Sequence, residues 1–255
     1  MKFIHVGIAA LIVSALGLGP AWAQQRPSEA EKQEQVSTTH VEIHHRFDGL
    51  SSGELPDSKA LLLTFEHYSE QSYGDQFFFF DVLGNTPDQG RYFKTGEMFF
   101  RWDPRFSIPR IFNLSMPEKE ALIQDYYFSV RLTDVDVPYI NQAFMWGSSI
   151  DLRLSDDFIP VLNLYARKAE ENRWAPMLAA AWQGPFTFFG ADFRFKGFID
   201  FYRVNEGWIF HTQPQLLFPI SKTISLGTEH QISRNLYSAE AGWVWLPTLF
   251  LKVFF

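Results

Sequence analysis

Acidic and basic side chains alternate with large apolar side chains along several segments of the sequence. In the segment 188–200 the charged positions are Asp192, Arg194, Lys196 and Asp200, and the apolar positions are Phe189, Phe193 and Phe195. Because successive side chains of an extended strand point to opposite faces, this spacing predicts strands with one apolar face and one ionisable face. Charges enclosed together are expected to pair across the enclosure, since burying single charges is costly.

The alternation also assigns side chains that could contact a polar solute on the enclosed face. Aromatic rings can stack on a flat solute, while carboxylate, amide and guanidinium groups can satisfy its hydrogen bonds. Each of these side chains could equally be part of a structural ion pair that fills the interior, and the sequence leaves both readings open. The expected solute-contacting set is Glu66, Tyr68, Asp81, Glu97, Phe99, Arg101, Asn163, Tyr165, Arg167 and Asp200. Arg105 is expected to anchor a turn at a strand end.

A histidine cluster near the start of the first predicted strand raises the question of a metal site. His44 and Glu42 share one strand face, and His40 and His45 are close in sequence. Closed zinc sites require four ligands, and this pattern offers two on one face. The cluster is therefore expected to be a solvated, histidine-rich strand start, with neither a metal ion nor a cofactor.

Serine and histidine residues that could support a lipid hydrolase are scattered along the chain. A nucleophilic serine needs a histidine base and an orienting polar partner. No sequence spacing joins the candidates, so the chain is not expected to be an enzyme. These candidates are Ser148, Ser149 and Ser225 with His67, His211 and His230.

The last nine residues alternate up to an aromatic carboxy-terminus. Leu249, Leu251, Val253 and Phe255 share one strand face, while Thr248, Phe250, Lys252 and Phe254 share the other. A terminal strand this apolar must be paired on both edges and covered on one face, because ordering a terminus costs entropy. This face is expected to contact lipid. The barrel assembly machinery is expected to recognise the strand that ends at Phe255.

The amino-terminal segment resembles a secretory signal. Lys2 provides a positive start, residues 6–18 are apolar, and Ala21-Trp22-Ala23 fits a cleavage site, so residues 1–23 are expected to be removed near Ala23. The apolar stretch is short for a membrane-spanning helix. Residues 24–40 are polar and are expected to form a periplasmic tail, with the barrel proper at 41–255.

Composition narrows the class of protein further. Aromatic residues make up 17% of the chain, yet the mean hydropathy is only −0.12, and the chain contains no cysteine. A barrel in the outer membrane needs aromatic residues for its lipid face and girdles, and polar residues for its lumen. The net charge of −7 argues against nucleic-acid binding. A soluble lipocalin-like barrel is the competing fold.

Twelve segments of strand character follow one another, separated by clusters of turn residues. Because each spanning strand takes about 9–11 residues, the sequence predicts an all-β protein, a transmembrane antiparallel β-barrel of about 12 strands with a narrow lumen. The segments are 41–47, 60–68, 76–83, 95–102, 125–132, 141–152, 158–167, 174–182, 188–203, 207–218, 222–233 and 243–255.

Three stretches resemble the nucleoside-specific channel-forming outer-membrane proteins, the Tsx-like family, or a relative within that superfamily. The most specific is the segment 98–108, with the sequence MFFRWDPRFSI. The segments 63–66 with 77–81, and 150–152 with 162–167, resemble the early and mid-chain hairpins of that family in the same order. The resemblance implies a monomeric 12-stranded barrel with a keyhole-shaped lumen, in which aromatic and ionisable side chains contact a nucleoside.

These observations lead to an expected function. The chain is expected to lie in the outer membrane of a Gram-negative bacterium, surrounded by lipid, and to act as a channel for passive uptake of small polar solutes, nucleosides foremost. A plugged barrel that acts as a receptor or binding protein is the alternative, followed by a lipid-modifying enzyme. Adenosine-sensitive conductance would separate these functions.

Overall fold

The computed structural model describes residues 36–52, 60–84, 98–135, 142–169, 173–204, 207–237 and 242–255. The predicted signal segment, residues 24–35 of the predicted tail, and Glu97 lie outside these ranges. The elements are β1 (Ser37–Arg46), β2 (Leu50–Ser51), β3 (Ala60–Gln71), β4 (Gly74–Gly84), β5 (Met98–Ser107), α2 (Ile108–Phe112), β6 (Ile123–Val135), β7 (Ala143–Leu152), β8 (Val161–Ala169), β9 (Ala175–Phe188), β10 (Ala191–Val204), β11 (Gly207–Thr212), β12 (Gln215–Pro219), β13 (Ile224–Arg234) and β14 (Trp243–Phe254).

These strands form a single antiparallel sheet that closes on itself. Neighbours in sequence pair from β3 to β10, β13 pairs with β14, and β14 pairs with β1, which pairs with β3. β11 and β12 lie one after the other between β10 and β13, and β2 follows β1 along the edge of β14. Each of these two pairs of elements counts as one interrupted strand. The predicted barrel of about 12 strands is therefore confirmed.

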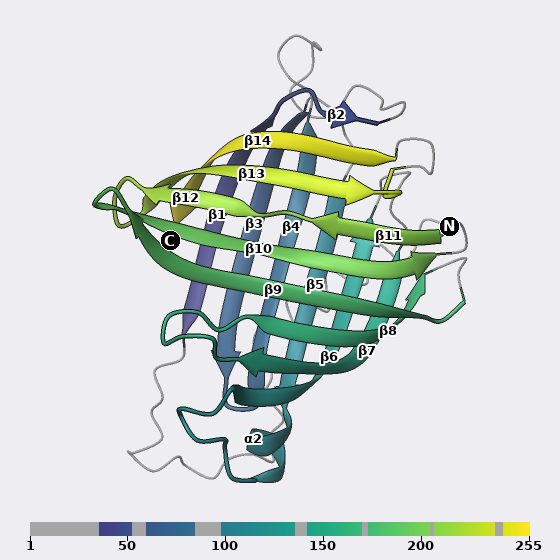
Figure 1. Cartoon of the computed structure of the whole chain (residues 1–255), viewed down its shortest axis with the longest axis vertical. Helices are drawn as coiled ribbons and strands as arrows, with labels where there is room; N and C mark the ends of the chain where they lie inside the picture. The colour runs from purple at the N-terminus through teal and green to yellow at the C-terminus, as the bar shows by residue number, and fades with distance from the viewer. Residues whose placement is uncertain are drawn as a thin grey trace. The chain divides into compact units, whose positions relative to one another are not determined.

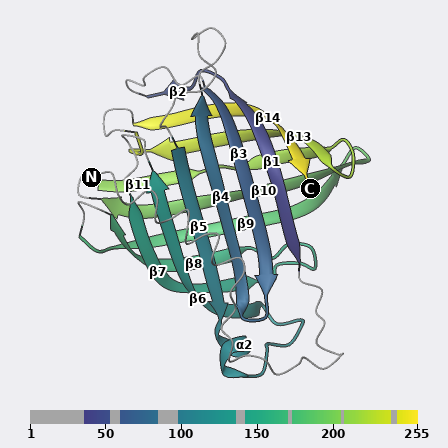
Figure 2. The same ribbon diagram turned by 180° about the vertical axis from the view of Figure 1, so that it is seen from behind.

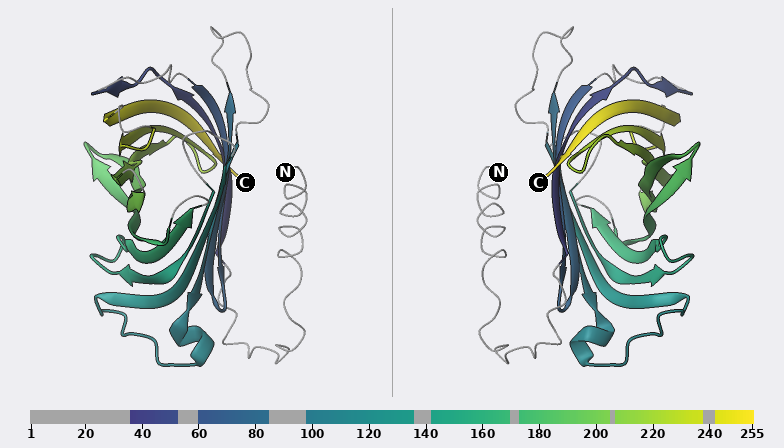
Figure 3. Two further views of the ribbon diagram at one scale, coloured as in Figure 1. Left: turned by 90° about the vertical axis from the view of Figure 1, so that its right-hand side faces the viewer. Right: turned by 90° about the vertical axis from the view of Figure 1, so that its left-hand side faces the viewer.

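The strands are steeply tilted, as closure of a barrel requires. In Figure 1, β9, β10 and β13 in front run almost across β1, β3 and β4 behind. Figure 2 shows that rear wall from its own side, and Figure 3 shows the blue and green walls on opposite sides of the interior. Among the described residues, no helix is long and apolar enough to cross a membrane.

The barrel has an apolar outer face and a polar interior. In β14, Leu249 and Leu251 are 41% and 39% exposed, whereas Thr248 and Lys252 are buried. The buried side chains also include a large number of charged residues from other strands. This distribution is the reverse of a soluble barrel and is typical of a barrel surrounded by lipid. The alternation expected for the last strand is confirmed.

Outward aromatic side chains lie near both ends of the strands and also mid-strand, where Phe65 stacks on Phe78 at a centroid distance of 5.9 Å. Near the connections that include 136–141, 170–172 and 205–206, Phe201 stacks on Trp208 at a centroid distance of 4.7 Å. Near the opposite ends, Phe186 stacks on Phe193 at 5.4 Å. Two aromatic girdles are the expected membrane–water boundary of an outer-membrane barrel. The first girdle contains Trp146, Trp174, Phe201, Trp208, Phe210 and Trp243, and the second Tyr73, Phe106, Phe128, Phe186, Phe193 and Phe218.

Several predicted strand boundaries differ from those observed. β1 begins at Ser37, so residues 37–40 belong to the barrel rather than to a tail. The predicted strand 188–203 is one strand, β10, with Phe188 at the end of β9 and a turn at Phe189 and Gly190. The predicted strand 207–218 is interrupted at residues 213–214, where Pro214 cannot donate a ladder hydrogen bond.

The segment 98–108 departs most from its prediction. β5 does not end at Trp102 but continues to Ser107, so Pro104 lies within the strand. The bridges between β5 and β6 skip Asp103 and Pro104, and the proline has no N–H group to donate there. Ser107 then caps α2, because its hydroxyl accepts a hydrogen bond from the Arg110 N–H at 3.3 Å. The continued strand turns Asp103 and Arg105 toward the interior.

Candidate functional site

The central feature of the interior is a network of two arginines and two aspartates. Arg101 binds Asp103 through Nη2 at 2.6 Å, and Arg131 binds the same carboxylate through Nε at 2.9 Å. Arg131 Nη1 also donates to Asp200 Oδ1 at 3.0 Å, and Arg101 Nη1 lies 3.9 Å from Asp200 Oδ2. All four residues are buried. Since β10 faces β5 and β6 across the interior, these ion pairs span the lumen.

A second network spans the interior from β10 toward β1 and β3. Lys196 Nζ lies 2.9 Å from Glu66 Oε2 and 3.6 Å from Glu42 Oε1. Lys252, from β14, lies 2.8 Å from Glu42 and 3.6 Å from Glu66. Two ammonium groups therefore neutralise two carboxylates. Thr64 donates to Asp81 at 2.6 Å on the same interior face.

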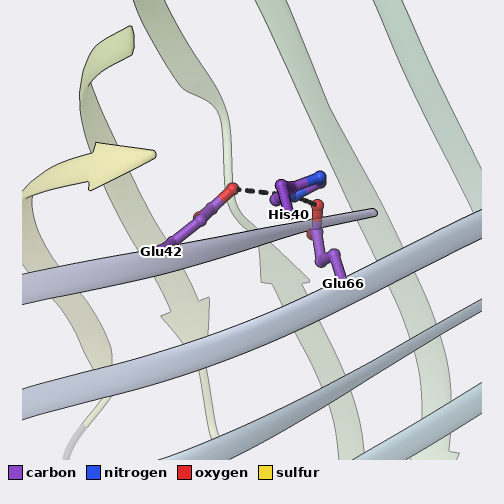
Figure 4. Close-up of side chains that lie close together, drawn as sticks. All are labelled: His40, Glu42 and Glu66. Carbon is purple, nitrogen blue, oxygen red and sulfur yellow. Dashed lines mark ion pairs between the residues drawn. The ribbon is translucent and has the colours of Figure 1, made fainter. Parts of the chain in front are cut away.

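His40 completes this second network, as Figure 4 shows. Its Nε2 lies 3.2 Å from Glu42 and also forms an ion pair with Glu66. His44 lies 2.8 Å from the other oxygen of Glu42. The expectation of a solvated histidine-rich strand start was wrong for His40 and His44, because β1 turns both inward. On the same strand, Val41, Ile43 and His45 face outward.

His40, Glu42 and Glu66 place one ligand atom each within 4.8 Å of one another. Three such groups could in principle approach a metal ion. Lys196 and Lys252 already contact both carboxylates, however, and a cation placed among them would face two like charges. The contacts within this group are those of an ion-pair network.

A third network lies closer to the end of the barrel that carries α2. Arg105 holds Asp75 with two hydrogen bonds, from Nε at 2.8 Å and from Nη2 at 2.5 Å, and donates to Asp151 at 2.6 Å. The Tyr127 hydroxyl donates to the second oxygen of Asp151 at 2.9 Å. Arg105 was expected to anchor a turn, but it is an interior residue within β5.

Guanidinium groups lie over tyrosine rings at three positions in the interior. Arg105 lies 4.2 Å from the centroid of the Tyr127 ring, and Arg131 lies 5.2 Å from that of Tyr165. Arg167 lies 4.3 Å from that of Tyr202. These pairs follow one another across β5, β6, β8 and β10. The interior therefore offers charge and an aromatic face side by side, and such contacts are favourable.

The structure places nine of the ten predicted solute-contacting residues on the interior face, and the tenth, Glu97, is outside the described ranges. Phe99 stacks on Phe79 at a centroid distance of 5.3 Å, and Asn163 accepts a hydrogen bond from the Tyr165 hydroxyl at 3.2 Å. Tyr68 is on the face of β3 that carries Thr64 and Glu66. Arg101 and Asp200 lie in the first network and Glu66 lies in the second, while the others lie elsewhere on the interior face, so the nine form a lining and not a single pocket. They are Glu66, Tyr68, Asp81, Phe99, Arg101, Asn163, Tyr165, Arg167 and Asp200.

The interior also holds residues that the predicted set omits. Asp103, Arg105, Arg131 and Lys252 each take part in an interior ion pair. Arg131 was missed although it alternates with Leu132 and Val130 in a predicted strand, and that alternation was a usable signal. Asp103 and Arg105 were missed because Pro104 indicated a strand end.

The candidate serine nucleophiles have no histidine bonded to them in the part of the chain that the structure describes. Ser149 is buried and hydrogen-bonded to Ser129 and Asn163. His67 contacts Thr39 and His230 contacts Trp245. None of these contacts has the serine–histidine geometry that activates a nucleophile.

No protein-family model and no curated protein matches the sequence. The structure of the KdgM porin matches with a TM-score of 0.50 at 8% identity, covering 85% of this chain and 99% of that chain. The two share a barrel fold.

Two further structures match at lower scores. An outer-membrane channel from Pseudomonas putida F1 has a TM-score of 0.44 at 9% identity, covering 93% of this chain and 100% of that chain. The outer membrane protein Omp33 of Acinetobacter baumannii has a TM-score of 0.41 at 7% identity, covering 86% of this chain and 97% of that chain.

Proposed function

We propose that this chain is a channel in the outer membrane of a Gram-negative bacterium, for passive uptake of small polar solutes, with nucleosides as the solute class. One observation carries the proposal: a closed barrel with an apolar outer face and two aromatic girdles encloses charged networks and aromatic rings. An apolar-ligand carrier would require the reverse distribution of side chains. The proposal includes cleavage near Ala23, insertion by the barrel assembly machinery and a monomeric state.

The interior chemistry suits a flat, polar solute. Arg101 lies between the rings of Phe79 and Phe198, at 5.9 and 5.4 Å from their centroids. A base could stack on such rings while its donors and acceptors form hydrogen bonds with Arg101, Asn163 or Asp200. Transport requires contacts favourable enough for entry and loose enough for exit, so each contact need contribute only about 1 kcal/mol.

The second candidate is a plugged barrel that acts as a receptor or binding protein. The cross-lumen pairs Arg131–Asp200 and Lys196–Glu66 favour it, because they join opposite walls of the barrel. Paired charges of this kind can also narrow a pore without closing it. Solute flux decides between the two functions.

Swelling of liposomes that contain the purified barrel tests the proposal. We expect adenosine to enter faster than a neutral disaccharide of larger cross-section. Arg101→Ala and Tyr165→Ala should reduce the preference for adenosine while the barrel keeps its heat-resistant folded form on gels. If the wild-type barrel admits neither solute, the channel proposal fails and the plugged barrel is favoured. If both variants fail to fold, the two residues are structural.

A further inference from the structure

Arg167 differs in its partners from Arg101, Arg105 and Arg131, the arginines of the interior networks. Arg101, Arg105 and Arg131 each bind one or two carboxylates, whereas Arg167 forms no ion pair with any described carboxylate. Arg167 is only 5% exposed. Asp200 of β10, which is separated from β8 by β9 alone, is bound instead by Arg131 at 3.0 Å. A buried guanidinium without a counter-charge is costly, so an anion supplied from solution would stabilise it.

The surroundings of Arg167 leave its hydrogen-bond donors available. The guanidinium lies over the face of the Tyr202 ring at 4.3 Å, which leaves its edge free. Met145, which pairs in register with Arg167, belongs to a buried apolar cluster that also includes Met177 and Ala169. None of these side chains can accept a strong hydrogen bond from an arginine.

The position of Arg167 allows access by a solute. It is two residues from the end of β8 and pairs in register with Met145 of β7 and Ala175 of β9, close to the barrel end that carries the first aromatic girdle. No Arg167 nitrogen is among the described polar atoms that are fully buried without a hydrogen-bond partner, so the guanidinium keeps some contact with solvent. The methionine side chains beside it adapt their shape readily. A small group could therefore reach the guanidinium edge.

We propose that Arg167 and Tyr202 form a binding site for the anionic group of a solute, a carboxylate or a phosphate. The guanidinium group donates two hydrogen bonds to two oxygens of such a group, and the Tyr202 ring packs against the face of the guanidinium and fixes its orientation. This inference rests on the proposed channel function, and among small polar solutes it favours those that carry an acidic group over neutral nucleosides. For a nucleoside scaffold, the favoured form is the monophosphate.

The proposal predicts a specific difference in binding. We expect calorimetry on the purified barrel in detergent, at low salt, to show that adenosine 5′-monophosphate binds about tenfold more tightly than adenosine. Arg167→Gln should bring both affinities to the same value, and Arg167→Lys should keep part of the difference because it keeps the charge but not the fork. Added sodium chloride should weaken only the binding of the monophosphate.

Lys168→Gln is the matched control. It removes the same charge one residue away, on the outward face, where Lys168 lies 5.9 Å from the Trp174 ring. This variant should bind the monophosphate as the wild type does. Equal affinities of the wild type for the two compounds would overturn the proposal, and so would undiminished binding of the monophosphate by a folded Arg167→Gln barrel. If Arg167→Gln does not fold, the wild-type comparison remains decisive.

Binding in detergent does not require transport, so the channel proposal and the anion-site proposal can be refuted independently. A barrel that binds the monophosphate through Arg167 but admits no solute into liposomes would support the anion site and refute the channel. A barrel that admits adenosine and its monophosphate equally, with equal affinities, would support the channel and refute the anion site.

Discussion

Arg131 and Asp200 are joined across the barrel interior by a 3.0 Å hydrogen bond, although three strands separate β6 from β10 in the sheet. Arg131 is also bound to Asp103, which keeps a counter-charge on the guanidinium if Asp200 is lost. The bridge can therefore be removed without leaving an isolated buried charge.

Replacement of Asp200 by alanine should widen the lumen at this bridge. We expect a larger single-channel conductance and a shift toward anion selectivity, because the variant loses an interior carboxylate while Arg101 and Arg131 remain. The loss of one charged hydrogen bond should lower the free energy of unfolding by about 1.5–3 kcal/mol. Conductance and reversal potential under a salt gradient check this prediction.

Asp192→Ala provides the control for that experiment. Asp192 is on the same strand but is exposed beside the turn, where it accepts a hydrogen bond from Thr187. The Asp192→Ala variant should keep the single-channel conductance and the reversal potential of the wild type. If Asp200→Ala conducts like the wild type, the bridge does not limit the pore.

A charged substitution on the outer face should destabilise the barrel in lipid. Leu251→Arg places a guanidinium in the apolar band, which costs about 2–4 kcal/mol near the middle of a bilayer. Unfolding by urea in lipid vesicles measures the effect, and Thr223→Arg in the exposed turn between β12 and β13 is the control. Equal stability of the two variants would show that Leu251 does not face hydrocarbon.

Phe250 packs against Gly227 inside the barrel, and the glycine is needed there. A Cβ atom at residue 227 would lie 2.2 Å from the Phe250 ring, which is 1% exposed and stacked on His44 at 4.7 Å. Gly227→Ala should therefore destabilise the barrel by about 1–3 kcal/mol. The double variant with Phe250→Leu should recover part of this loss. A stable Gly227→Ala barrel would contradict the packing.

Deletion of Phe255 separates assembly from stability. The residue is 82% exposed, and its backbone N–H donates to Thr39 O at 3.1 Å, so its ring contributes little to the folded barrel. We expect the purified, refolded variant to unfold like the wild type, while the amount of heat-modifiable barrel in the outer-membrane fraction of cells falls. Normal assembly in cells would refute a role of the last residue in recognition.

The strand pattern and the direction of most interior side chains could be predicted from the sequence. In residues 192–196 of β10 and 248–252 of β14, inward polar residues alternate with outward apolar ones, apart from the inward Phe250, and the period of two determines the face of each side chain. The alternation failed where a local signal competed with it. Pro104 indicated a strand end, because proline removes a ladder hydrogen bond, yet the pairing of β5 with β4 continues past it.

The pairing of interior charges could not be predicted in the same way. Which residues meet across the lumen depends on strand order, tilt and register, and Lys196 is separated by 130 positions from its partner Glu66. The contact of His40 with Glu66 depends on the register of β1 with β3, in which these two residues pair. Local spacing contains no information on either relationship.

Single-channel recording in planar bilayers tests the central claim most directly. We expect stepwise conductance from the purified wild-type barrel. The steps should be small because ion pairs span the lumen, and adenosine or its monophosphate should reduce them. A folded barrel that inserts into the bilayer but conducts no ions would contradict the account.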